Sequence, residues 1–331
     1  MALLGGLLLW VAPAEAAAPA RATWRPFAPV RQAVDLAGPR RDGTLVVATG
    51  GRLSLLLPGR NQSRPFARGP GGYSTSPGTE PYIALAPQRR LRRAGCSWRR
   101  DDVYALEPAG ALGIVRVDST GRATRFANLP AAAGLPSGIT FDRVGAFGGR
   151  LLVTQTDGVV TAVSAVDCRG RVSTLTRSAP HVEGGIEVAP RGFGRFGGQL
   201  IAPDELSGRV WAIDAHGRSR PLVHPRLATG GDIGVESVGF VPSGFERGYA
   251  LLADRGVPGN PHPGTDTVLR VGGGALRRAG VREGDLLVAT EGSASTVAVR
   301  CAGRTCSVRR VAVGPPVAHA EGHIAFDVPL R

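Results

Sequence analysis

The sequence predicts an all-β protein built from a repeated four-stranded unit. A phrase of the type FGGRLLVT is followed in most copies by a short strand and a turn of the form Asp-x-x-Gly-Arg. A unit of this kind cannot bury its own faces, so copies must stack on one another. The number of copies then predicts a six-bladed β-propeller of four-stranded antiparallel blades. The copies lie at 42–49, 100–107, 147–154, 196–203, 247–254 and 283–290.

Three units can be divided into strands in order. Each has four short apolar segments, and its last two segments are joined by a tight turn that opens at Asp118, Asp167 or Asp214 and places Gly where φ is positive. No stretch of the mature chain shows helical periodicity. The predicted strands are 82–87, 102–107, 113–118 and 122–127; 138–142, 150–154, 159–167 and 171–176; and 186–189, 199–203, 209–214 and 218–223.

The spacing of the units predicts where the ring closes. Most copies are about 50 residues apart, the length of one blade, but the last two are only about 36 apart. We therefore expect lost or shortened strands at that junction, and blade counts of five or seven stay open. The segment 322–329 reads as another first strand, which could close the ring beside the N-terminal blade.

The chain divides into a leader and one domain. Residues 1–18 read as a secretory signal peptide, with an apolar run followed by the small-x-small site Ala14–Ala16; an uncleaved anchor is the alternative. Residues 19–40 are expected to lead into the first blade, and 41–331 to form a single propeller domain. No second apolar stretch suggests a membrane span, so we expect a secreted, extracellular protein.

The net charge of +14 does not by itself indicate a nucleic-acid partner. All 40 basic residues are arginines, and most are scattered singly through turns. The dense cluster 89–100 reads as a solvated basic loop in preference to a polyanion site. Aromatic residues make up only 5% of the chain, which leaves few stacking platforms for single strands. We expect no nucleic-acid partner.

Carboxylates fall at equivalent places in the blades. An inner strand starts, and a second strand ends, on the same face of a propeller, so the side chains at these points should surround one mouth of the channel. The basic cluster and the Asp-x-x-Gly-Arg turns should lie on the opposite face. The side chains before inner strands are Glu80, Glu183, Glu236, Glu321 and Ser137; those after second strands are Asp204, Glu205, Asp254 and Glu291, with His262 and Asp266 in a nearby loop.

Several carboxylates around one axis repel one another unless a cation lies between them. An all-oxygen ring suits Ca²⁺ first and Mg²⁺ or Mn²⁺ next. The alternative is that these acids only hydrogen-bond backbone N–H groups between blades. His323 reads equally as a packed channel residue or a functional one, and His262 as a solvated loop residue.

Four cysteines in a secreted chain predict two disulfides. Cys301 and Cys306 lie on either side of a turn, close enough to bridge. That leaves Cys96 and Cys168, which the blade pattern places on the basic face of neighbouring blades, where a bridge is feasible.

The motifs resemble a known family. The Glu-Gly-x-apolar inner strands, the segment 136–139 (PSGI) and the Gly-rich blades are similar to the six-bladed calcium-dependent propellers of the senescence-marker-protein, gluconolactonase and luciferin-regenerating group, and more loosely to strictosidine-synthase-like and NHL-type propellers. In that group a channel metal is held by a Glu before an inner strand and by Asn or Asp in Pro-x-Gly segments. Glu80, Glu183 and Glu321 match the Glu position, whereas Ser137 and Glu236 stand where the family has Asn or Asp.

Two functions follow from these expectations. The first is a metal-dependent lactone or ester hydrolase, with Glu80, Glu183, Glu236 and Glu321 as metal ligands and Asp204 or Asp254 as the proton carrier. The second is a non-catalytic extracellular binding module for a glycan or a protein. Either would place a small-molecule or glycan ligand at the channel mouth. A quinone-dependent sugar dehydrogenase is a weaker third reading, because no cofactor-binding Arg/His set is evident.

Overall fold

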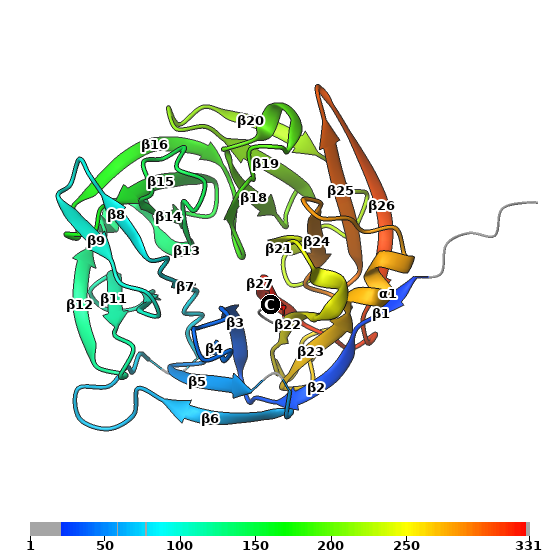
Figure 1. Cartoon of the computed structure of the whole chain (residues 1–331), viewed down its shortest axis with the longest axis horizontal. Helices are drawn as coiled ribbons and strands as arrows, with labels where there is room; N and C mark the ends of the chain where they lie inside the picture. The colour runs from blue at the N-terminus through cyan, green and yellow to red at the C-terminus, as the bar shows by residue number, and fades with distance from the viewer. Residues whose placement is uncertain (1–20, 58, 77, 329–331) are drawn as a thin grey trace, which may run out of the picture.

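The computed structural model describes residues 21–57, 59–76 and 78–328, and the strands of these residues form six sheets around a central axis (Figure 1). The predicted six-bladed β-propeller is therefore confirmed. The expected signal peptide at 1–18 lies outside the described residues. No helix in the described ranges has the length and apolar character needed to span a membrane.

The first four blades follow the chain from the axis outward. Blade one contains β3 (Ala33–Ala37), β4 (Leu45–Thr49), β5 (Arg52–Leu57) and β6 (Gln62–Phe66). Blade two contains β7 (Ile83–Leu85), β10 (Val103–Glu107), β11 (Gly113–Val117) and β12 (Ala123–Asn128). Blade three contains β13 (Leu135–Phe141), β14 (Leu151–Thr156), β15 (Val160–Val166) and β16 (Val172–Pro180). Blade four contains β17 (Glu187–Val188), β18 (Leu200–Asp204), β19 (Arg209–Ile213) and β20 (Ser219–Val223).

The last two blades are interleaved. The inner strand of blade five, β21 (Val235–Phe240), pairs with β24 (Leu286–Thr290), and the two strands between them in sequence belong to blade six. Blade five continues with β25 (Thr296–Ala302) and β26 (Thr305–Val313). Blade six contains β27 (Ala320–Asp327), β22 (Tyr249–Asp254) and β23 (Thr267–Gly272), and the helix α1 (Gly273–Arg278) leads from β23 back to blade five.

This exchange corrects the expectation of lost strands. The short step between the copies at 247–254 and 283–290 arises because the two copies are the second strands of different blades, reached out of order. The C-terminal strand β27 is the inner strand of blade six and lies beside β3, as expected for a strand that closes the ring. Both blades have their full complement of strands.

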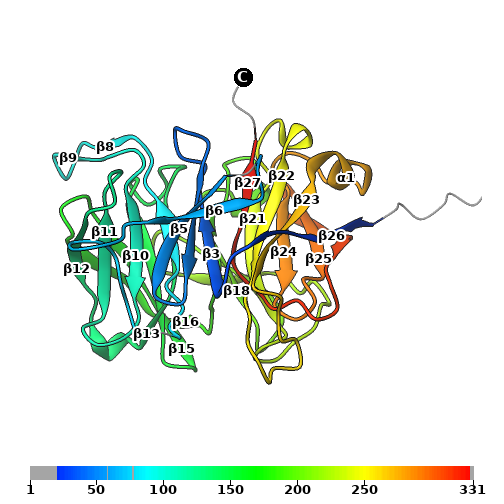
Figure 2. The same ribbon diagram turned by 90° about the horizontal axis from the view of Figure 1, so that it is seen from below.

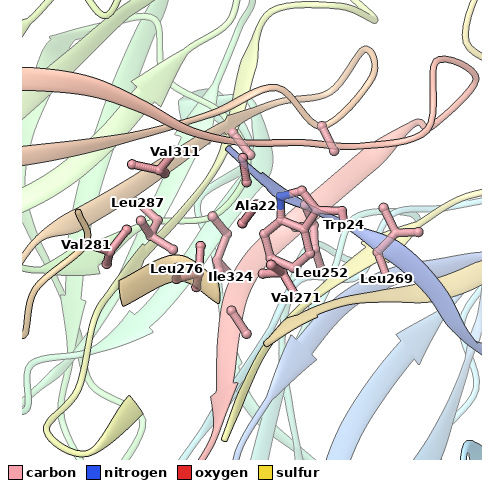
Figure 3. Close-up of a cluster of buried hydrophobic side chains, with 14 of the residues drawn as sticks. Ala22, Trp24, Leu252, Leu269, Val271, Leu276, Val281, Leu287, Val311 and Ile324 are labelled. Atoms are coloured by element: carbon pink, nitrogen blue, oxygen red, sulfur yellow. The ribbon is translucent and has the colours of Figure 1, made fainter. Parts of the chain in front are cut away.

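The N-terminal segment adds the outer strands of the interleaved pair. β1 (Ala22–Thr23) pairs with β26 in parallel, and β2 (Arg25–Pro29) pairs with β23 antiparallel. Between them, Trp24 is 1% exposed and its indole N–H donates a hydrogen bond to Thr296 Oγ1 at 2.8 Å. Figure 3 shows Trp24 among side chains from both blades and from α1. Residues 22–37 are thus already part of the blades.

Burial falls from the axis outward in each blade. The inner and second strands, such as β3 and β4, are almost completely buried because neighbouring blades cover both of their faces. The outer strand β6 is exposed except at Phe66. The sequence follows this gradient, with continuous apolar runs in second strands and polar residues in outer ones.

The predicted turns and cross-links are present. The Asp118, Asp167 and Asp214 carboxylates accept the backbone N–H groups two and four residues later. Disulfides join Cys96 to Cys168 and Cys301 to Cys306, as predicted. The hairpin of β8 (Arg89–Leu91) and β9 (Cys96–Trp98) lies on one face of the disc (Figure 2). Three 3₁₀ turns, at Ala131–Ala133, Gly194–Phe196 and Phe245–Arg247, interrupt the described loops.

Candidate functional site

Six glutamates gather at one mouth of the channel, on the face opposite the β8–β9 hairpin. One of them, Glu236, is buried, and its burial raises its pKa well above the usual value. The charges of Glu183, Glu205, Glu291 and Glu321 raise this pKa further. The carboxylates are therefore close enough to act on one another; Glu236, Glu291 and Glu321 are buried, and the other three are half-buried. The six are Glu80, Glu183, Glu205, Glu236, Glu291 and Glu321.

Two cations lie among these acids. The Arg255 guanidinium contacts Glu80 and lies 3.4 Å from Glu321 Oε1. His319 Nε2 lies 2.8 Å from Glu291 Oε1 and 3.4 Å from Glu321 Oε1. Burial opposes the imidazolium charge, but the two glutamates outweigh it and raise the pKa of His319 to about 10. Arg255 and His319 were not predicted, although each lies within two residues of a predicted acid.

Glu236 is stabilised in its protonated form. It is 3% exposed, and the Tyr82 hydroxyl donates a hydrogen bond to its Oε1 at 2.8 Å. Tyr82 is itself buried, and burial followed by the charge of Glu236 raises the pKa of its phenol. A neutral Glu236 avoids a charge that no cation of the described residues contacts.

The channel narrows just below the mouth. A Cβ atom on Gly185 would lie only 2.4 Å from the Gly322 carbonyl oxygen, so two inner strands approach to backbone contact. Deeper still, the His323 Nδ1 lies 2.9 Å from Asp35 Oδ1 and its Nε2 lies 2.9 Å from the Ile186 carbonyl oxygen. Both ring nitrogens face acceptors, which fits an imidazolium, and although burial opposes that charge the pKa of His323 is raised to about 8, chiefly by Asp35. His323 is a packed channel residue.

One group at the mouth has the donor spacing of a metal site. Within the described ranges, single donor atoms of Asp232, Glu291 and His319 lie within 4.8 Å of one another. Glu291 Oε2 and His319 Nδ1 are buried without a hydrogen-bond partner in the described structure, and His319 would act as a ligand only after losing the proton of its imidazolium. Two carboxylates and an imidazole fit a divalent cation. This group shares only Glu291 with the residues singled out from the sequence.

A cavity of about 640 Å³ opens beside the acids, between the loops of blades two, three and four. Its polar side is formed by Glu80, Tyr82, His181 and Glu183, and Leu135 and Pro136 contribute to its apolar wall. A cavity of this volume accommodates a small organic ligand. Two of the six glutamates therefore border a space of ligand size, although the channel beside it is closed.

His181, in the wall of this cavity, lies between Glu183, which also lines it, and Asp204. Its Nε2 lies 3.8 Å from Glu183 Oε2, and its Nδ1 lies 3.5 Å from Asp204 Oδ1. Burial, and then the Glu205 and Glu80 carboxylates, raise the pKa of Glu183 to about 7. The pKa of His181 is also raised, first by Asp204. His181 was missed in the sequence because a lone histidine before a Glu-Gly-Gly strand carries no motif.

Asp204 is held in its ionised form. Ser207 donates hydrogen bonds to it from its backbone N–H, at 3.1 Å, and from its hydroxyl, and the Trp211 indole lies 3.4 Å away. Burial acts against ionisation, but His181, Ser207 and Trp211 outweigh it and lower the pKa of Asp204 to about 2. An acid with so low a pKa carries protons poorly, and its contact with His181 is a 3.5 Å ion pair in which Nδ1 forms no hydrogen bond in the described structure.

The other predicted site residues organise the loops of this face. Asp254 is fully buried and accepts the His319 backbone N–H at 2.8 Å, which positions the histidine. Asp266 accepts the backbone N–H groups of Gln32 and Gly256. His262 Nδ1 lies 2.7 Å from the Pro316 carbonyl oxygen.

Ser137 has no activating base. Its hydroxyl lies 3.2 Å from Thr154 Oγ1 and 3.3 Å from the Val182 carbonyl oxygen, and it borders the cavity without contacting a histidine in the described structure. It therefore lacks the geometry of an activated nucleophile.

Comparison with solved structures finds other propellers. A virginiamycin B lyase from Staphylococcus aureus with quinupristin has 12% identity and a TM-score of 0.44, over 72% of this chain and 65% of that one. A calcium-binding protein, regucalcin, from Agrobacterium tumefaciens has 12% identity and a TM-score of 0.49, over 87% of this chain and 79% of that one. A gluconolactonase from Xanthomonas campestris has 15% identity and a TM-score of 0.42, over 70% and 69%.

The chain thus spans slightly under two thirds of the first of these proteins. No family model matches it, and no curated protein matches it in sequence. The solved structures include the regucalcin and gluconolactonase kinds of propeller that the sequence resembles. At these identities the likeness is one of fold.

Proposed function

We propose that this protein is a secreted hydrolase that cleaves a small lactone or ester in the cavity beside the channel mouth. The observation that carries the proposal is the pairing, inside a 640 Å³ cavity, of His181 with a glutamate whose pKa is about 7. A carboxylate with this pKa is ionised in part at neutral pH and still basic enough to accept a proton. The two disulfides support an oxidising, extracellular location.

The proposed reaction uses both groups. Ionised Glu183 takes a proton from water as the water oxygen bonds to the carbonyl carbon of the substrate. The bond from that carbon to the leaving oxygen then breaks, and the imidazolium of His181 gives its proton to the leaving oxygen. Asp204, ionised behind His181, positions the ring and stabilises its charge. The products are a carboxylic acid and an alcohol, joined in one molecule when the substrate is a lactone.

The cavity favours a ligand rich in hydroxyl groups. Glu80 and Glu183 can accept hydrogen bonds from hydroxyls, and the Leu135–Pro136 wall can cover one apolar face. A sugar lactone has both features.

A divalent cation at Asp232, Glu291 and His319 would supply positive charge to the acidic mouth. Its binding can be measured by calorimetric titration with Ca²⁺, Mg²⁺ and Mn²⁺, alone and after chelation. We expect stabilisation of about 2.7 kcal/mol at a hundredfold excess over Kd, lost in Asp232→Asn. No heat of binding and no shift in Tm with any of the three ions would remove the metal from the proposal.

The hydrolase is tested with a panel of sugar lactones and aryl esters. We expect turnover by the wild type, a loss of about 10²-fold or more in Glu183→Gln, and little change in the matched control Glu283→Gln on the opposite face. Equal rates in all three proteins would reject the proposal.

A binding module without catalysis is the second candidate. Arg255 and His319 already pair with Glu80, Glu291 and Glu321, which is the arrangement of a charge-balanced structural cluster. Tight binding of a lactone or glycan without turnover would favour this candidate.

A further inference from the structure

The β8–β9 hairpin has two unlike sides. Its inner side is anchored by Leu91 and Trp98, which are 5% and 2% exposed. Its outer side and its two ends carry a series of exposed arginines. The hairpin itself lies on one face of the disc (Figure 2). These arginines are Arg90, Arg92, Arg93, Arg99 and Arg100.

The hairpin is fixed to the next blade at three points. The Trp98 indole N–H donates to the Gly149 carbonyl oxygen at 2.9 Å, and the ring packs edge-on against Tyr104 and Phe141. The Arg89 guanidinium donates to the backbone carbonyl oxygens of residues 142 and 143. The disulfide from Cys96 to Cys168 adds a covalent link. The arginines are exposed to solvent, as expected from the sequence, and these contacts hold the backbone that carries them.

A cavity of about 730 Å³ lies between this hairpin, the loop 145–150 and the turn after β15. Arginines dominate its lining, and its single acid, Asp167, already accepts the backbone N–H groups of Arg169 and Arg171. In the described part of the chain, no arginine that lines the cavity forms an ion pair with a carboxylate. The lining arginines are Arg89, Arg90, Arg92, Arg93, Arg150 and Arg171.

Unpaired guanidinium groups held close together create a strongly positive potential. Arg89 and Arg150 already donate to neighbouring backbone and hydroxyl oxygens, which leaves the exposed Arg90, Arg92 and Arg93 to form bidentate hydrogen bonds with a sulfate, phosphate or carboxylate group. Because the hairpin is already ordered, a ligand loses less affinity to the ordering of side chains and loops. These features define an anion-binding site.

We infer that this arginine cavity binds an anionic glycan, a polysaccharide that carries sulfate, phosphate or carboxylate groups. The cavity has the volume of a few sugar units, and its lining holds no exposed aromatic ring on which a nucleic-acid base could stack. The two disulfides also favour a ligand met in an oxidising, extracellular environment. The site is separate from the acidic mouth, so it does not depend on the proposed hydrolase.

The test uses the full chain and a defined sulfated glycan, heparin. Affinity is measured by calorimetry at several salt concentrations for the wild type, for Arg90→Gln/Arg92→Gln/Arg93→Gln, and for the matched control Arg52→Gln/Arg60→Gln/Arg64→Gln in blade one. Both variants lose three charges, so the net charge falls equally. We expect at least a tenfold loss of affinity and a shallower salt dependence in the hairpin variant, and less than a twofold loss in the control.

Three results would overturn the inference. Equal losses in the two variants would show binding by net charge alone. Tighter binding of duplex DNA than of heparin would point to nucleic acid, and tighter binding of phosphatidylserine vesicles would point to a membrane surface. The Tm of each variant is compared with that of the wild type. Because the three substituted arginines of each variant are exposed, we expect both Tm values to be unchanged.

Discussion

The pair of Tyr82 and Glu236, joined by a 2.8 Å hydrogen bond, shows how the mouth of the channel tolerates so many acids. Glu236 is buried, faces four other carboxylates and has no cation within hydrogen-bond reach in the described structure, so its neutral form is favoured. Glu321, by contrast, contacts both Arg255 and His319. Residues of one type at equivalent positions of the repeat thus have different partners.

The protonation of Glu236 makes stability depend on pH. An acid whose pKa is raised in the folded state stabilises the protein at low pH and loses that contribution as pH rises above its unfolded value of 4.5. Glu236→Gln cannot ionise and keeps an oxygen for the Tyr82 hydroxyl. We expect the variant to gain ~1 kcal/mol or more in unfolding free energy relative to the wild type between about pH 5 and about pH 8. Urea unfolding at both pH values measures this, and a pH-independent difference would contradict it.

The positions of the acids were predictable at this scale, but their partners were not. The blade repeat places a Glu before each of several inner strands, and the register then brings them to one mouth. The cations come from residues outside the repeat, Arg255 after a second strand and His319 in the interleaved junction. Contacts of that kind depend on which strands pair. The spacing of the repeat copies did not predict the strand pairing in blades five and six.

At the scale of elements, the exchange of strands between blades five and six is the main departure from a simple repeat. β22 and β23 leave blade five after its inner strand and complete blade six, and the chain returns through α1. The sequence predicted the positions of the strands, because the apolar segments and the turns between them are local patterns. Their pairing is non-local, and no local signal distinguishes a strand that pairs with its predecessor from one that pairs with the C-terminus.

The two disulfides should contribute unequally. Cys96 and Cys168 are separated by 72 residues, and Cys301 and Cys306 by five. Because cross-linking a longer loop removes more entropy from the unfolded chain, we expect a loss of about 4 kcal/mol in Cys96→Ala/Cys168→Ala and about 2 kcal/mol in Cys301→Ala/Cys306→Ala. Urea unfolding compares the two variants, and an equal or larger loss in the second would contradict this order.

At the scale of the whole molecule, the ring is closed by both ends of the chain. β27 supplies the inner strand of blade six, while β1 and β2 supply outer strands of blades five and six. Closure therefore joins residues separated by almost the full length of the protein. The prediction of a C-terminal inner strand was confirmed, whereas the pairing of the N-terminal segment carried no signal in the repeat.

Trp24 should be the most sensitive position in this closure. It is buried among side chains of both interleaved blades, and its indole N–H is satisfied by Thr296 (Figure 3). Trp24→Ala leaves a cavity and removes the donor to Thr296 Oγ1, which keeps only its bond to the Ala294 carbonyl oxygen, so we expect a loss of about 3–5 kcal/mol. The control Val308→Ala, at a side chain exposed on β26, should change stability by no more than about 0.5 kcal/mol. Similar losses in both variants would show that the N-terminal strands do not anchor the ring.

The two faces of the disc carry opposite charge. Acids surround the channel mouth on one face, and unpaired arginines cover the hairpin on the other. We therefore assign the two faces to different ligands, with the neutral, hydroxyl-rich substrate of the proposed hydrolase at the mouth and a polyanion at the hairpin.

The pH dependence of hydrolysis by the wild type and by Glu183→Gln tests the central claim most directly. With the best substrate of the lactone and ester panel, kcat/KM of the wild type should rise with an apparent pKa near 7 as Glu183 ionises. Glu183→Gln should lack this rise and be about 10²-fold slower or more at about pH 8. An unchanged profile in the variant, or no hydrolysis of any substrate by the wild type, would contradict the account.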